Sequence, residues 1–85
     1  MLYRIITENK NYDHIVEIVK VYFTGFTIIK AQGYWKNTAE HSLIIEIVTD
    51  KANRNQIDHI AYNIKKRNEQ QAVLVQSIPV ESKLI

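Results

Sequence analysis

Apolar residues follow two different spacings along the chain, and together these predict four strands and two helices. Residues 2–7 alternate and are rich in β-favouring side chains, which predicts a strand. Residues 12–23 carry apolar side chains at three- and four-residue spacing, which is typical of a helix with one buried face. The same spacing predicts a second helix between Asp50 and Asn68. The remaining strands are predicted at 26–35, 41–48 and 72–78.

A few polar, glycine and proline residues mark the expected ends of these elements. Asn11 is placed to cap the first helix, and Gly25 is expected to end it in a left-handed conformation. Gly33 lies inside a strand, which indicates a bulge or a close backbone approach. The polar stretch 36–40 predicts a turn, and Pro79 ends the last strand because proline has no N–H to donate.

The order strand–helix–strand–strand–helix–strand predicts an α+β domain of the ferredoxin-like βαββαβ type over residues 1–79. Right-handed crossovers give an antiparallel four-stranded sheet in the order 4-1-3-2, with both helices on one face. The run Leu43-Ile44-Ile45 makes the third strand apolar on both faces, as expected of a central or covered strand. We expect the bare sheet face to assemble a homo-oligomer. Residues 80–85 are expected to form a tail that adds an edge strand to a neighbouring subunit.

Composition restricts the classes of function and location. The chain has 85 residues and no cysteine, so disulfides and thiolate metal sites are excluded. Its net charge of +2 is too small to predict nucleic-acid binding. No apolar run approaches the roughly 18 residues of a membrane span, and the N-terminal residues do not resemble a secretion signal. We expect a cytoplasmic protein, of a cell or a virus-infected cell, without a membrane partner.

The sequence contains no motif for catalysis, cofactor binding or metal binding. Glycine-rich phosphate-binding motifs are absent, and the carboxylates are scattered. His14, His41 and His59 lack metal-ligand spacing, and we interpret His14 and His59 as surface side chains beside acidic neighbours. We therefore predict a non-enzymatic protein without cofactor or metal. An enzyme acting through Glu46 and a histidine is the weakest alternative. The turn at 8–11 could hold an anion at a helix start, although a capped helix alone is the favoured interpretation.

The most unusual stretch is 30–36, which holds the single tryptophan next to a tyrosine. Aromatic faces with nearby cations suit stacking of a planar base, with lysine on a phosphate. Aromatic residues at a strand end are also common anchors between subunits, and simple intrachain packing is a third interpretation. The predicted ligand-binding residues are Lys30, Gln32, Tyr34, Trp35, Lys36, Arg4 and Lys10.

Several short motifs resemble those of a known family. They are Phe26-Thr27 after Gly25, Gly33-Tyr34-Trp35, Glu40, Ser42 and Gln71-Ala72-Val73-Leu74-Val75. This pattern is similar to domain of unknown function 3574, a family of small bacterial proteins, over roughly residues 23 to 78. That family has no assigned activity, so the resemblance implies no substrate.

More distantly, the layout resembles the PII and CutA group of signalling and metal-tolerance proteins. Proteins of that group are ferredoxin-like trimers that bind small ligands, often nucleotides, between subunits near the hairpin of the second and third strands. The corresponding hairpin here, 34–41, is far shorter than the PII regulatory loop. The resemblance implies a PII-like homo-oligomer, first a trimer and alternatively a dimer, that binds or sequesters an anionic or nucleotide-like molecule. Separately, a compact chain without motifs is compatible with a virus, phage or other mobile element as its source. The alternative is a protein-interaction module that uses the same aromatic hairpin.

Overall fold

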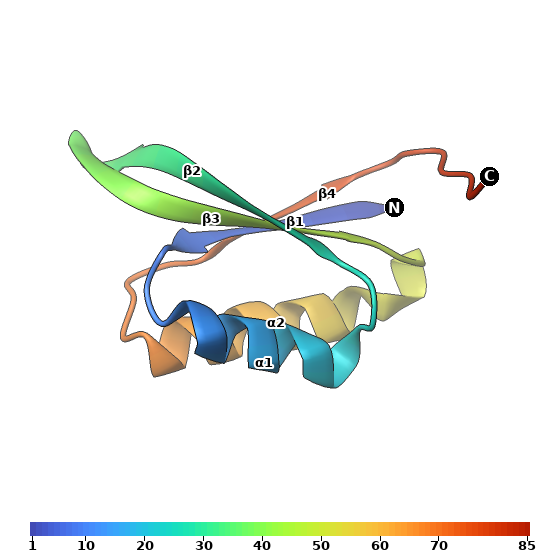
Figure 1. The fold of residues 1–85 in the computed structure, drawn as a ribbon, viewed down its shortest axis with the longest axis horizontal. Coiled ribbons are helices and arrows are strands. Elements are labelled where there is room, and N and C mark those ends of the chain that lie inside the picture. Colours follow the sequence, from blue (N-terminus) through green and yellow to red (C-terminus); the bar gives the residue numbers. More distant parts are fainter.

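The structure, a computed structural model, describes all of residues 1–85. Its elements are β1 (Leu2–Glu8), α1 (Tyr12–Tyr22), β2 (Thr27–Trp35), β3 (Thr38–Val48), a 3-10 turn (Lys51–Asn53), α2 (Arg54–Arg67) and β4 (Leu74–Ile78). The four strands form one antiparallel sheet in the order β2-β3-β1-β4, and both helices cover the same face (Figure 1). The predicted ferredoxin-like fold and strand order are confirmed. Neither helix is long and apolar enough to cross a membrane.

The core lies between the sheet and the two helices. Alternate residues of the two central strands point toward the helices, because successive side chains of a strand face opposite ways. The buried apolar core comprises Tyr3, Ile5, Ile15, Ile18, Val19, Leu43, Ile45, Ile47, Ile57, Ile60, Ala61 and Ile64. Most of these are aliphatic, so removal of apolar surface from water is the main stabilising contribution.

The β2–β3 connection is tighter than the sequence predicts. Only Lys36 and Asn37 lie outside the strands, and both have positive φ angles, 52° and 62°. Two consecutive residues of this conformation form a type I′ turn, which suits the twist of a hairpin. The predicted turn at 36–40 is therefore wrong in extent, and β3 begins at Thr38.

The two helix-end predictions were wrong in detail. Gly25 does not adopt a left-handed conformation, since α1 ends at Tyr22 and Phe23 is already extended. Asn11 does precede α1, but its side chain caps no helix amide and its own φ is 56°. Its amide Nδ2 instead donates to Oδ1 of Asn68, 2.9 Å away. A tertiary hydrogen bond has replaced the local cap.

A cluster of polar side chains joins the β1–α1 turn to the residues after α2. We call it the buried polar cluster after its buried members Thr7, Asn68 and Gln70; its other two members, Lys10 and Asn11, are exposed. Asn68 is 2% exposed, and its side-chain Nδ2 donates to the backbone oxygen of Lys10 at 2.9 Å. Thr7 Oγ1 lies 2.9 Å from Oε1 and 2.7 Å from Nε2 of Gln70. No buried side-chain polar atom of the chain lacks a partner. The cluster fixes both loops at one end of the sheet.

Gly33 makes the close approach that its position in a strand indicates. The β2–β3 register runs through Gly33 without a bulge, opposite Glu40. A Cβ atom at Gly33 would lie 2.9 Å from Oγ of Ser42, a buried side chain. The absence of a side chain therefore leaves room for the Ser42 hydroxyl.

Substitution Gly33→Ala tests this close approach. We expect it to lower the free energy of unfolding by about 1 kcal/mol, because the Ser42 hydroxyl must leave its rotamer. In the double variant Gly33→Ala with Ser42→Ala, the added methyl group no longer meets the hydroxyl, so this cost should disappear. Urea unfolding of the full double-mutant cycle measures the coupling, and additive effects would contradict the contact.

Candidate functional site

The sheet face opposite the helices carries two apolar rows with a polar row between them. Residues paired across antiparallel strands lie on the same face, so the register assigns each row. The first apolar row is Ile29, Ile44, Ile6 and Leu74, and the second is Val48, Leu2 and Ile78. Leu74 and Val48 are 53% and 56% exposed, although they belong to large aliphatic types. We call these rows, with the polar row, the open face.

The polar row of the open face contains an ion pair. It runs Thr27, Glu46, Arg4 and Gln76 across the four strands. Arg4 Nε lies 2.9 Å from Oε2 of Glu46, and both side chains remain partly accessible. Arg4, predicted as a ligand residue, is thus already paired with a carboxylate of its own chain.

The β2–β3 hairpin projects beyond the helix layer, at the upper left of Figure 1. Its two aromatic residues are correspondingly exposed, Tyr34 by 74% and Trp35 by 48%. Neighbouring residues of a strand point to opposite faces, so Trp35 lies on the open-face side and Tyr34 on the helix side. The most distinctive pair of the sequence is therefore divided between two surfaces.

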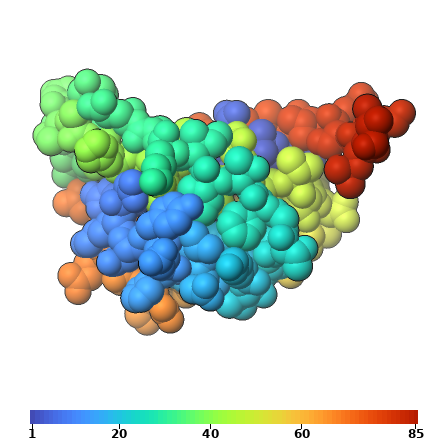
Figure 2. All heavy atoms as spheres, in the orientation of Figure 1, coloured from blue at the N-terminus to red at the C-terminus, as the bar shows by residue number.

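Small side chains adjoin Trp35 on the open-face side. Gly33 and Ala31 precede it on the same side of β2, and Ser42 pairs with Ala31 across the ladder. These residues leave a low floor between the indole and the first apolar row, and Glu40, which pairs with Gly33, lies at its border. Figure 2 shows the hairpin and the C-terminal segment rising at opposite ends of the open face, with a lower middle between them. A planar ring could lie on this floor against Trp35.

The other predicted residues of β2 lie on the helix side. Lys30, Gln32 and Tyr34 alternate along the strand with the open-face residues. Lys30 Nζ lies 5.6 Å from the centre of the Tyr12 ring, a distance that suits a cation–π interaction. Tyr12 opens α1, and the sequence reasoning did not select it.

The two remaining predicted lysines also have partners within the chain. Lys36 Nζ donates to Oε1 of Gln71 at 3.2 Å, which links the hairpin turn to the loop before β4. Lys10 Nζ donates to the backbone oxygen of Asn68 at 2.8 Å. Lys10 therefore contributes to the buried polar cluster, and the turn at 8–11 is held by this tertiary contact and not by the expected helix cap. The predicted ligand residues do not form one pocket in a single chain.

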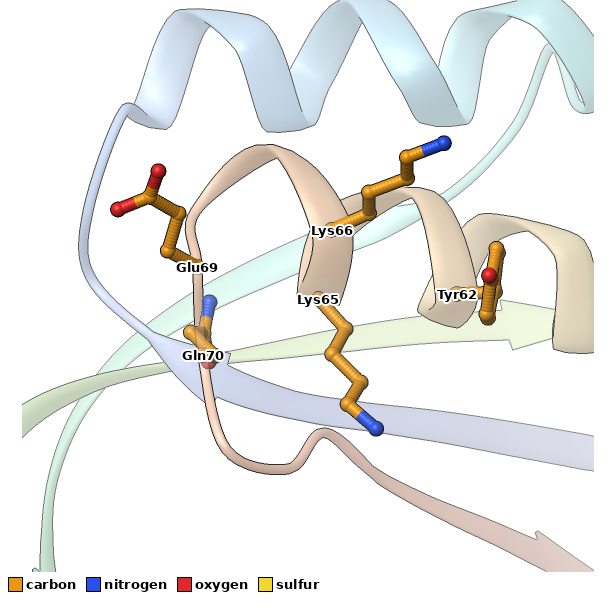
Figure 3. Close-up of a pocket in the computed structure, with 5 residues that line it drawn as sticks. All are labelled: Tyr62, Lys65, Lys66, Glu69 and Gln70. Atoms are coloured by element: carbon orange, nitrogen blue, oxygen red, sulfur yellow. The ribbon is translucent and has the colours of Figure 1, made fainter.

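A shallow hollow of about 390 Å³ lies at the C-terminal end of α2, apart from the hairpin. Its lining residues are Tyr62, Lys65, Lys66, Glu69 and Gln70 (Figure 3). The Lys65 and Lys66 side chains point in different directions, so their charges do not converge on one position. These lysines follow the pattern of cations at the negative end of a helix dipole.

The histidines form no catalytic arrangement with Glu46. His14, His41 and His59 are all exposed, in agreement with the surface interpretation. Glu46 lies on the open face, whereas His41 pairs with Gln32 on the helix side of the sheet. No group of three His, Asp or Glu residues is placed to hold a metal ion. The Glu46–histidine hypothesis therefore has no geometric support.

The sequence did not lead us to expect that the predicted ligand residues would lie on two different faces of the sheet. The alternation of β2 contained the signal for separating Tyr34 from Trp35, once the strand limits were fixed. The partners Tyr12, Gln71 and Asn68 lie 18 to 58 positions away from the lysines they contact, so no local pattern indicates them.

Comparison with known proteins shows the fold and no family. No family model and no curated protein sequence matches the chain. Among solved structures, it is similar to a DUF3240 family protein from Shewanella baltica OS155, with a TM-score of 0.74 and 19% identity. That match covers 99% of this chain and 94% of the other. It is also similar to a phage SAM lyase in its apo state, with a TM-score of 0.69, 14% identity, and coverage of 87% and 75%.

These similarities test the earlier expectations only at the level of the fold. A protein of an uncharacterised family shares the architecture, but neither the resemblance to domain of unknown function 3574 nor that to PII and CutA is confirmed. The expectation of a non-enzymatic protein is likewise not confirmed, since the second neighbour is an enzyme by name.

Proposed function

We propose that this protein is a homo-oligomer, with three subunits as the leading arrangement, which binds a small anionic or nucleotide-like molecule between subunits. The observation that carries the proposal is the projecting hairpin, whose Trp35 lies beside a low floor that continues into an apolar open face. A single chain provides one wall for a planar ligand, and a second subunit on the open face supplies the other.

The extent of exposed surface supports assembly. The chain exposes 6145 Å², whereas compact monomers of 10.0 kDa expose about 5200 Å². The surplus of roughly 900 Å² includes the exposed segment 80–85 as well as the open face, and both surfaces are accessible to another copy. The self-paired Arg4 and Glu46 can enter such an interface without leaving a single unpaired charge behind.

The arrangement of the predicted ligand residues also calls for more than one subunit. Trp35 faces the open side, and Lys30, Gln32 and Tyr34 face the helix side of the same hairpin. In an oligomer, the open side of one hairpin and the helix side of another can meet around one ligand, with Lys36 at the turn. The indole would stack on the base, and lysine would pair with a phosphate.

The second structural neighbour guides the choice of the first compounds to test. A phage SAM lyase has this fold, and SAM contains an adenosine group. We therefore take adenosine-containing compounds as the first probes. The proposed protein is a non-enzymatic one that binds or sequesters this molecule. Its proposed origin is a phage, and its proposed location is the cytoplasm.

Native mass spectrometry and Trp35 fluorescence test this function together. Protein purified from cells should show a mass above that of one chain, with a retained small molecule. Titration with ATP, AMP and SAM should change the fluorescence of the single tryptophan and raise the melting temperature. Unchanged fluorescence and melting temperature at millimolar ligand would exclude the nucleotide version.

Substitution of Trp35 tests its role directly. Trp35→Ala should weaken binding of the ligand so identified about tenfold or more, because stacking contributes about 1 to 3 kcal/mol per base. Tyr62→Ala is the matched control, since Tyr62 is an exposed aromatic residue of α2, 64% accessible and away from the hairpin. If Trp35→Ala abolishes assembly and no ligand is found, the interaction-module alternative is favoured instead.

A further inference from the structure

Residues 80–85 leave the domain as an exposed segment without regular structure. Its last two side chains, Leu84 and Ile85, are fully exposed to water. Ile78 of β4 pairs with Leu2, the first residue of β1, so β1 has no strand left to pair with the residues that follow Pro79. None of the backbone hydrogen bonds outside the helices and strands uses residues 80–85.

Two strands of the sheet have an unpaired outer edge, β2 with nine residues and β4 with five, and β2 therefore offers the longer edge. The order β2-β3-β1-β4 leaves β2 paired on one side only. In a hairpin closed by a type I′ turn, the residues flanking the turn, Trp35 and Thr38, form a hydrogen-bonded pair. Odd-numbered residues of β2 therefore bond to β3. The even-numbered ones direct N–H and C=O outward, and these are Ile28, Lys30, Gln32 and Tyr34.

We propose that residues 80–85 of one copy add as an edge strand to β2 of a neighbouring copy. The polarity of the two segments matches. β2 presents Ile29 and Ala31 on the open-face side and Lys30 and Gln32 on the helix side. Continuing the alternation of β4 places Val80, Ser82 and Leu84 on the open-face side and Glu81, Lys83 and Ile85 on the other. Val80 and Leu84 would then lie on the same side as the apolar residues of β2, and Glu81 on the same side as its lysine and amide.

Residues 80–85 cannot pair in this way with β2 of their own chain. Two strands, β1 and β3, separate β4 from β2, so the edges lie about 14 Å apart. Six residues would use most of their length crossing the open face instead of running along the edge. Pairing with another copy joins two different surfaces, and such head-to-tail contacts close into a ring when the rotation between copies allows it. A ring of this kind agrees with the trimer of the proposed function, on whose homo-oligomeric state this inference rests.

Hydrogen exchange compares the full chain with a variant that ends at Pro79. In the full chain we expect slow exchange at the even-numbered β2 amides, with Lys30 and Gln32 the clearest reporters. In the shortened chain these amides should exchange at least tenfold faster, while the odd-numbered ones stay protected by β3. The subunit dissociation constant should rise about tenfold or more. Equal exchange rates and equal association in both proteins would overturn the inference and leave assembly through the open face intact.

A second variant tests the β2 side of the contact. Gln32→Pro removes an outward N–H without removing a hydrogen bond to β3, so circular dichroism should show a folded sheet. We expect it to weaken association to the same degree as the shortened chain. Ala31→Pro, one position away, should unfold the hairpin because it removes a bond to β3. Full association of a folded Gln32→Pro would contradict the strand addition, and a full-length chain that stays monomeric would overturn both this inference and the proposed function.

Discussion

Replacement of Ile45 by alanine is expected to lower the free energy of unfolding by about 3 kcal/mol. Ile45 is fully buried on the helix side of β3, between paired residues of β1 and β2. Its truncation leaves a cavity between two fixed layers that cannot close around it. Since a domain of this size is stable by only about 4 to 13 kcal/mol, the loss is a large fraction. Urea unfolding followed by circular dichroism measures it.

The adjacent residue gives a matched control for this prediction. Ile44 has the same side chain on the same strand, but it lies half-buried on the open face. At low protein concentration, Ile44→Ala should cost about 1 kcal/mol or less. At high protein concentration, the same substitution should lower the free energy of unfolding further if subunits cover the open face. Association then contributes to the stability of the folded protein by mass action. Equal losses for both variants in the dilute protein would mean that the faces of β3 are wrongly assigned.

The second large effect is expected for Asn68→Ala, with a loss of about 2 kcal/mol. The change removes the amide that joins Asn11 to the Lys10 carbonyl. Both partners then remain in a partly buried region without their hydrogen bonds. Thermal unfolding measures the loss, and hydrogen exchange of residues 8–11 should show local loosening of the β1–α1 turn.

Asn63→Ala provides the control for the buried polar cluster. Asn63 lies on the same helix, half-buried and outside the cluster. Its replacement should leave stability unchanged or slightly raised, because alanine is the better helix former. A loss for Asn63→Ala as large as that for Asn68→Ala would show that the cluster contributes nothing specific.

The fold was predictable because its signals are periodic and local. Alternation in β1 and the helical spacing of Ile15, Ile18 and Val19 identified elements that tertiary packing then confirmed. The extent of the β2–β3 turn was not predictable from the sequence. Polar residues such as Thr38 and Glu40 occur both in turns and on strands, so their polarity does not separate the two. Only the backbone of Lys36 and Asn37 decides this, and composition does not determine backbone angles.

The candidate site was predictable as a stretch of sequence and not as a surface. Tyr34 and Trp35 are neighbours in the chain, and strand geometry places them on opposite faces. The lysines were selected for their charge, but tertiary contacts occupy them: Lys10 with the Asn68 carbonyl and Lys36 with Gln71. Such contacts depend on how loops distant in sequence are brought together.

The buried polar cluster also affects the order in which the chain can fold. Its side-chain hydrogen bonds join residues 57 to 63 positions apart, and the β1 ladder reaches β4 at the far end of the domain. During synthesis, β1 can pair with β3 but must wait for almost the whole chain before its second neighbour emerges. Contacts of such long sequence separation slow folding, because loop closure comes before the stabilising pairings. We therefore expect a nascent chain that holds the edge of β1 unpaired until the last strand leaves the ribosome, when the sheet and both loops close in one late step.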